Sequence, residues 1–215
     1  MLQTENETNT TRIEPEGILE NIITYLCGKA NPISTTKLVK LVYLVDLYHK
    51  QLFGTTATGV EFINYRYGPW SPDIGQSVEE LIGKDIIEER TVTTRNGQEA
   101  NIPALKGTTA VRLSRSVLEA LDGVISDWGN KNTDEIVKYI KTTVPFCGTS
   151  FNNPIDFERC DPIQEYATLK GITVEQAATE DILLNKPLVD ILKNASNSLQ
   201  QGGHLYTYKE MFPSE

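Results

Sequence analysis

Apolar side chains recur at three- and four-residue steps through much of the chain, and this spacing is typical of helices that bury one face. Glycine or proline follows several of these stretches and marks where a helix ends. The pattern predicts five helices ahead of the C-terminal part of the chain, over residues 18–28, 35–53, 72–82, 113–128 and 133–140.

The second of these helices is apolar on almost every side. Leu38, Leu41 and Val45 form one stripe, and Val39 extends the apolar surface round the helix. A helix of this kind has neighbours on several sides. We therefore expect residues 35–53 to form the centre of the core.

Two stretches with strand character flank Asn96-Gly97, a dipeptide that strongly indicates a tight β-hairpin. They predict strands within residues 86–94 and 98–105. The hairpin follows the third helix, which is the order found in a winged helix. The expected fold class is α+β and mainly α: a helical domain with one small β-hairpin in winged-helix-like order, and a C-terminal helical appendage.

The two ends of the chain differ from its middle. Residues 1–16 have too few apolar side chains to offset the entropy of ordering them, so we expect a disordered acidic tail. Glycine and proline punctuate residues 148–162, which indicates a connection between two parts. The expected division is a helical domain over 17–150 and a helical appendage over 151–215.

The appendage carries three predicted helices, over residues 163–169, 174–184 and 185–201. The last of them has an apolar stripe, which either packs within the chain or fills a groove on a partner protein. The stripe includes Leu188, Ile191, Leu192 and Leu199.

Charge and composition limit the classes of function. The formal net charge of -9, from 29 acidic and 20 basic residues, opposes binding to nucleic acid and favours a basic partner. No stretch is apolar for long enough to cross a bilayer, and residues 1–16 lack the character of a secretory signal. Three unevenly spaced cysteines fit a reducing compartment. We expect a cytoplasmic protein without membrane contact.

Residues suited to catalysis or metal binding do not form a recognisable set. The two histidines, His49 and His204, lie far apart in the sequence, and no zinc, phosphate-loop or dinucleotide motif is present. Asp46 and His49 fall one helical turn apart, where they can pair, but one helix face provides too few ligands for a metal. We expect a structural pair, no metal, no cofactor and no enzymatic activity.

Aromatic residues gather around a Gly-Pro turn, because Tyr65, Tyr67 and Trp70 surround Gly68-Pro69. Tyr and Trp are enriched at the centres of protein interfaces, so these side chains can form a partner-binding surface together with Pro69. Alternatively, they pack a loop against the second helix, while Pro69 simply fixes the turn before the third helix. Both interpretations stay open.

The segment 36–70 resembles the hallmark stretch of the Panacea domain, also called the SocA-like antitoxin domain. In that family a central helix with Lys-Leu, Tyr-Leu and Asp precedes a loop that ends in Gly-Pro, and a further helix follows. The resemblance extends over residues 17–145. The matching positions of this chain are Lys40, Leu41, Tyr43, Leu44, Asp46, His49, Gly68 and Pro69.

The resemblance implies a function. Members of the family are antitoxins, bacterial or phage proteins that neutralise a toxin encoded beside them, usually by direct binding, and one branch delivers its toxin to a protease. A cognate protein toxin is therefore the expected partner, and a protease is a second one if the chain is an adaptor. The alternative is a DNA-binding transcriptional regulator. The third helix opposes DNA binding, because it carries Asp73, Glu79 and Glu80 and phosphate repels acidic side chains. Its only basic residue is Lys84, at its end.

The C-terminal end has a second, weaker resemblance. The run from Pro187 to Gly203 and the following Tyr206-Thr-Tyr-Lys-Glu210 are similar to the toxin-binding end of prevent-host-death type antitoxins, although Lys209 stands where an acidic residue is common. This resemblance adds Tyr206 to the expected toxin contacts of the apolar stripe.

Overall fold

The computed structural model of the chain describes residues 14–30, 33–93, 97, 99–160 and 171–184. The chain divides into two units, residues 1–161 and 162–215. The described part of the second unit contains helix α8 (Val174–Leu184), which begins where the hydroxyl of Thr173 accepts a hydrogen bond from the amide of Gln176. All the other elements described below belong to the first unit.

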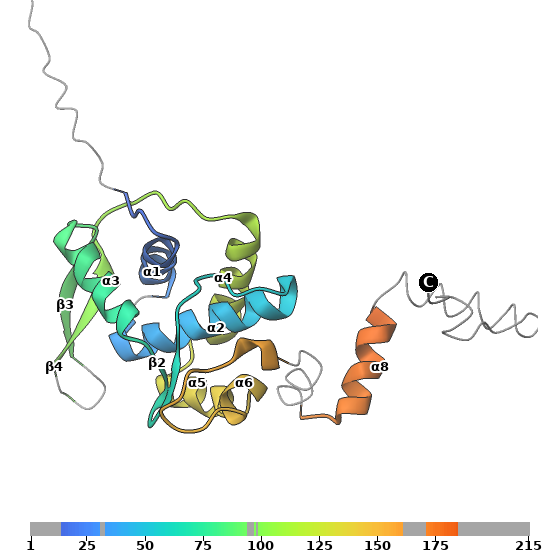
Figure 1. Ribbon diagram of the computed structural model, residues 1–215. Coiled ribbons are helices and arrows are strands. Elements are labelled where there is room, and N and C mark those ends of the chain that lie inside the picture. Colours follow the sequence, from blue (N-terminus) through green and yellow to red (C-terminus); the bar gives the residue numbers. More distant parts are fainter. Residues whose placement is uncertain (1–13, 31–32, 94–96, 98, 161–170, 185–215) are drawn as a thin grey trace, which may run out of the picture. The chain divides into compact units, whose positions relative to one another are not determined.

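The first unit is mainly helical, and its strands form two antiparallel hairpins (Figure 1). Its helices are α1 (Ile18–Lys29), α2 (Thr35–Phe53), α3 (Pro72–Gly83), α4 (Arg115–Trp128), α5 (Thr133–Ile140), α6 (Val144–Cys147) and the short 3-10 helix η1 (Phe157–Arg159). Its strands are β1 (Ile63–Tyr65), β2 (Gly68–Trp70), β3 (Ile87–Thr93) and β4 (Glu99–Leu105).

Helix α2 crosses the middle of the first unit, with α1 and α4 on one side and α5 and α6 on the other (Figure 1). It begins where Ser34 Oγ accepts a hydrogen bond from the amide of Lys37, and it ends at Gly54, whose φ of +78° is a left-handed conformation that glycine adopts readily. Its side chains are buried from Lys37 to Leu47. The prediction of a central helix with neighbours on several sides is confirmed.

The hairpin predicted after the third helix is present. Strands β3 and β4 pair antiparallel from Ile87 opposite Leu105 to Thr93 opposite Glu99. Ile87 is buried at the end of the hairpin that meets α3, whereas the far end of the hairpin is exposed. The expected order of a helix followed by a wing, and with it the mainly α fold class, is confirmed.

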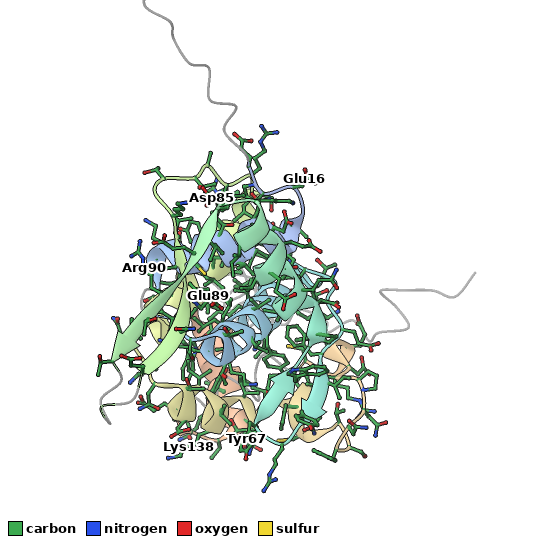
Figure 2. All side chains as sticks on the ribbon, turned by 90° about the vertical axis from the view of Figure 1, so that its left-hand side faces the viewer. Glu16, Tyr67, Asp85, Glu89, Arg90 and Lys138 are labelled. Atoms are coloured by element: carbon green, nitrogen blue, oxygen red, sulfur yellow. The ribbon has the colours of Figure 1, made fainter. Side chains whose placement is uncertain are left out.

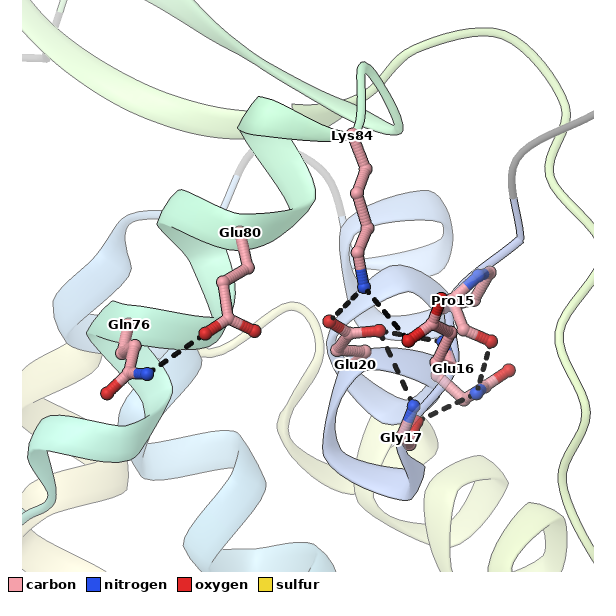
Figure 3. A network of polar contacts seen from close by, with 8 residues as sticks. Pro15, Glu16, Gly17, Glu20, Gln76, Glu80 and Lys84 are labelled. Atoms are coloured by element: carbon pink, nitrogen blue, oxygen red, sulfur yellow. Dashed lines mark hydrogen bonds and ion pairs between the residues drawn. The ribbon is translucent and has the colours of Figure 1, made fainter.

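Polar contacts attach the segment before α1 to the end of α3 (Figure 3). The carboxylate of Glu20 accepts hydrogen bonds from the backbone amides of Glu16 and Gly17 and from Lys84 Nζ, the last at 2.8 Å. Burial acts to raise the pKa of Glu20, but the hydrogen bonds outweigh it and hold the pKa below its usual value. Glu20 therefore caps α1 and joins it to α3 with one side chain.

Residues 151–160 pack with the first unit, beyond the division expected after residue 150. Ile155 and Phe157 are buried in the core, and the amide of Ile155 donates a hydrogen bond to the carbonyl of Phe62 at 2.7 Å. These contacts explain why the first unit extends to Asp161. The pattern of glycine and proline marked the irregular backbone of this segment but not its burial.

The β1–β2 hairpin was not expected from the sequence, which indicated only the hairpin around Asn96-Gly97. Ile63 pairs with Trp70, Asn64 with Pro69, and Tyr65 with Gly68. Each strand has three residues, too few for a pattern of alternating polarity to appear. This second hairpin carries the candidate site.

Candidate partner-binding site

Lys40 of α2 supports the β1–β2 hairpin from within the core. Its Nζ donates a hydrogen bond to the carbonyl oxygen of Pro69 at 2.6 Å, and only 4% of the residue is exposed. Burial disfavours the charged form of the amine and lowers the pKa of Lys40 from 10.5 to about 8. The first and the last position of the family motif, Lys40 and Pro69, thus form one contact that ties β2 to α2.

Gly68 lets the hairpin turn closely over this lysine. Its φ is +90°, a conformation that glycine adopts without steric cost. A Cβ atom at this position would lie 3.4 Å from Lys40 Cε and 3.5 Å from Val137 Cγ2 of α5. The backbone of the turn therefore lies directly against both α2 and α5.

Leu41, Tyr43 and Leu44 are fully buried core residues. The ring of Tyr43 meets Phe62 edge to face at a centroid distance of 5.4 Å, and it lies 5.2 Å from the ring of Phe157. Phe62 precedes β1 and Phe157 lies in η1, so this cluster fixes both segments that flank the hairpin. The motif tyrosine therefore works through packing.

Asp46 and His49 hold the loop that follows α2. Oδ1 of Asp46 accepts hydrogen bonds from the amides of Ala57 and Thr58, each at 2.8 Å, and Oδ2 accepts one from the hydroxyl of Thr58. His49 Nδ1 lies 2.6 Å from the carbonyl oxygen of Thr55, and its Nε2 lies 3.2 Å from Ser116 Oγ. Burial raises the pKa of Asp46 against the opposing effect of these hydrogen bonds. Both side chains have structural partners in this loop or in α4.

Residues 152–155 run along the edge of β1 that does not pair with β2. The amide of Asn64 donates to the carbonyl of Asn153 at 2.9 Å, and the amide of Asn152 donates to the carbonyl of Asn64 at 2.7 Å. The side-chain amide of Asn64 also donates to the carbonyl of Thr149 at 2.6 Å. This pairing places Phe151 beside the hairpin.

Four aromatic side chains are exposed on the hairpin and beside it. The exposed fractions are 46% for Tyr65, 66% for Tyr67, 44% for Trp70 and 64% for Phe151. The ring of Tyr65 stacks on Phe151 at a centroid distance of 5.7 Å and lies 6.2 Å from the ring of Trp70. We call these four residues the aromatic surface.

The exposure of these rings argues against one of the two interpretations of the sequence. Tyr65, Tyr67 and Trp70 do not fill the core beneath the hairpin, where Pro69 is buried instead. Core packing is therefore wrong for the three aromatic residues, and their role in binding a partner stays a prediction.

Phe151 was missed by the sequence reasoning. It lies in the stretch that glycine and proline marked as a connection, far along the chain from Tyr65. Its position depends on the long-range pairing of residues 152–155 with β1, for which the local sequence carries no signal.

The remaining predictions about sites have different outcomes. The predicted toxin contacts Leu188, Ile191, Leu192, Leu199 and Tyr206 lie outside the described residues. Across the described ranges, no group of three or more His, Cys, Asp and Glu side chains is placed to hold a metal ion. No helix in the described part of the chain is both long and apolar enough to cross a membrane.

The comparisons with known proteins agree with the resemblance drawn from residues 36–70. No curated protein and no solved structure matches the chain. The family described as antitoxin SocA-like, Panacea domain, matches residues 38–144, from α2 to the start of α6. Through these residues, the chain belongs to the family of antitoxin SocA-like proteins with a Panacea domain.

Proposed function

We propose that this chain is an antitoxin that neutralises a cognate protein toxin by direct binding, and that the aromatic surface makes the contact. The observation that carries the proposal is the exposed cluster in which Tyr65 stacks on Phe151 and lies beside Trp70. Three adjoining aromatic rings expose apolar area that a partner can cover. Tyr and Trp are among the side chains most enriched where interfaces gain most of their binding energy, and Phe adds a large apolar area.

The division of roles within the family motif supports this proposal. Lys40, Asp46 and Pro69 are buried and satisfied by contacts inside the protein, so they shape the hairpin and the loop without reaching a partner. The exposed residues that they position are the aromatic ones. A scaffold of this kind can keep its core while the exposed side chains select the toxin.

DNA binding through α3 is a weaker explanation of the same fold. Asp73, Glu79 and Glu80 are exposed on α3, where they would face phosphate. Lys84, the base at the end of this helix, is bound to Glu20 (Figure 3). The winged-helix-like order therefore does not bring a cationic helix to a DNA groove.

Co-expression with the toxin encoded beside the gene tests the proposal. We expect the wild-type chain to restore growth and to co-purify with the toxin. We expect the triple variant Tyr65→Ala, Trp70→Ala, Phe151→Ala to lose both properties while it remains folded by circular dichroism. Restored growth without any complex, together with chemical reversal of the toxin's product, would show that the antidote acts enzymatically. An adaptor would form the same complex but would protect cells only when the protease is present.

A further inference from the structure

Two basic side chains, Arg66 and Lys138, border the aromatic surface, and we call them the cationic edge. Arg66 lies at the tip of the β1–β2 hairpin, with its guanidinium carbon 5.6 Å from the centroid of the Tyr67 ring. Helix α5 lies against the same tip, because a Cβ atom on Gly68 would lie 3.5 Å from Val137. Lys138, the next residue of α5, lies close to Tyr67, as Figure 2 shows.

No salt bridge engages the basic side chains of this edge within the described residues, although Arg66 lies over the ring of Tyr67. Arg66, Lys138 and Lys141, which lies one turn beyond Lys138, are exposed, and the described residues include no ion-pair partner for any of them. The other described lysines and arginines mostly have a carboxylate partner, as is the case for Lys50, Lys84, Arg90, Lys106, Arg112, Lys131 and Arg159.

The acids of α5 lie in its first turn and form no salt bridge with this edge, although Glu135 attracts Lys138 at longer range. Glu135 accepts a hydrogen bond from the amide of Asn132 and pairs with Lys131 at 3.6 Å, so it is directed towards the start of the helix. Asp134, also in the first turn, is the remaining exposed acid of α5. Beyond that turn the exposed charges of the helix and of its end are Lys138 and Lys141.

We infer that the protein partner presents an acidic face to the tip of the hairpin, next to an apolar site that receives the aromatic surface. This inference rests on the proposed function and specifies its partner. The whole chain carries a formal charge of -9, so it favours a basic partner at long range, as the sequence suggested. At close range the cationic edge would repel basic groups and attract carboxylates, so it fixes how the partner is oriented.

Charge reversal at the edge tests the inference. The probe is the purified toxin from the neighbouring gene, and its association rate with the full chain is measured at low and at high ionic strength. Arg66→Glu and Lys138→Glu are each expected to slow association about tenfold at low ionic strength, and the effect should shrink as salt screens the charges.

Arg115→Glu is the matched control. Arg115 is exposed and begins α4, next to Ser116, which contacts His49. His49 lies about 13 Å along α2 from Lys40 at about 1.5 Å per residue, so the control alters net charge equally but at a distance from the hairpin. Thermal melting of all three variants verifies that they remain folded.

Each outcome separates the inference from the proposed function. Slower association of both edge variants with an unchanged control supports the inference. Equal rates for all variants, or faster association of the edge variants, would contradict it while leaving the antitoxin function intact. No binding by the wild-type chain would remove the proposed function and this inference with it. Tight binding of a single-stranded oligonucleotide that Arg66→Glu abolishes would identify nucleic acid, instead of a protein, as the ligand of the edge.

Discussion

Lys40 and Asp46 are charged residues buried on α2, and each reaches a segment outside its own helix. The sequence placed both in the family motif but gave no reason why a central helix should contain charges. The structure gives that reason, because the carbonyl of Pro69 and the amides of Ala57 and Thr58 are backbone groups that need hydrogen-bond partners. The side chain of Lys40 is the partner of the Pro69 carbonyl, and the side chain of Asp46 is the partner of the two amides.

The buried amine of Lys40 leads to a pH-dependent stability. Its pKa is about 8 in the folded chain, against 10.5 as the ordinary value. Below pH 8 both states carry the charge, so the folded state bears the full cost of burying it, and above pH 10.5 neither state is charged. Stability should therefore rise with pH between these values. The gain is about 3 kcal/mol, because each pKa unit corresponds to about 1.4 kcal/mol.

Denaturant unfolding at several pH values measures this gain, and Lys40→Met is the reference. The difference in unfolding free energy between wild type and variant cancels the other groups that titrate in this range. We expect the difference to shift in favour of the wild type as pH rises from 8 towards 10.5. Parallel curves for the two proteins would show that the amine titrates at its ordinary pKa.

At the scale of the elements, the β1–β2 hairpin depends on a left-handed residue. Gly68→Ala places a side chain at a φ of +90°, which costs about 1 to 2 kcal/mol of folding free energy. Gly75→Ala is the control, because Gly75 lies inside α3 with nothing within 4 Å of its added Cβ. The control should gain about 0.5 to 1 kcal/mol from reduced unfolded-state entropy and better helix propensity. Chemical denaturation compares them, and equal effects of the two substitutions would mean that the turn adapts without strain.

The segment after residue 150 is a structural part of the first unit. A chain that ends at Asp161 keeps Ile155 and Phe157 in the core and should melt cooperatively. A chain that ends at Ser150 loses both side chains and should lose about 3 to 6 kcal/mol, at about 1.5 to 3 kcal/mol for each. Calorimetry of the two truncated chains distinguishes them. Equal melting temperatures would show that the segment only covers the surface.

The elements differ in how far the sequence predicted them. The helices α1 to α5 and the β3–β4 hairpin were predicted because their apolar patterns are long and local. The β1–β2 hairpin was not, because its three-residue strands are specified by contacts with Lys40 and Asn153, which are distant in sequence. The same dependence on distant contacts hid Phe151.

At the scale of the whole molecule, the net charge of the chain and the charge beside the aromatic surface have opposite signs. The formal charge of -9 reflects the whole chain, whereas the aromatic surface borders Arg66 and Lys138. The net charge summed over the sequence therefore predicts the electrostatic field far from the molecule, but not the charge that a partner meets at one surface. The predicted partner contacts between residues 188 and 206 stay a separate prediction, since they lie outside the described residues.

The affinity of the full chain for the purified toxin, compared between Trp70→Ala and Phe53→Ala, tests the central claim most directly. The two side chains are similarly exposed, at 44% and 42%, but Phe53 contacts His49 at the end of α2 instead of joining the aromatic surface. Isothermal titration calorimetry should show Trp70→Ala weakening the complex by about 2 kcal/mol or more, about 30-fold in Kd, while Phe53→Ala leaves it unchanged. Wild-type affinity in a folded Trp70→Ala protein would contradict the claim that the toxin binds at the aromatic surface.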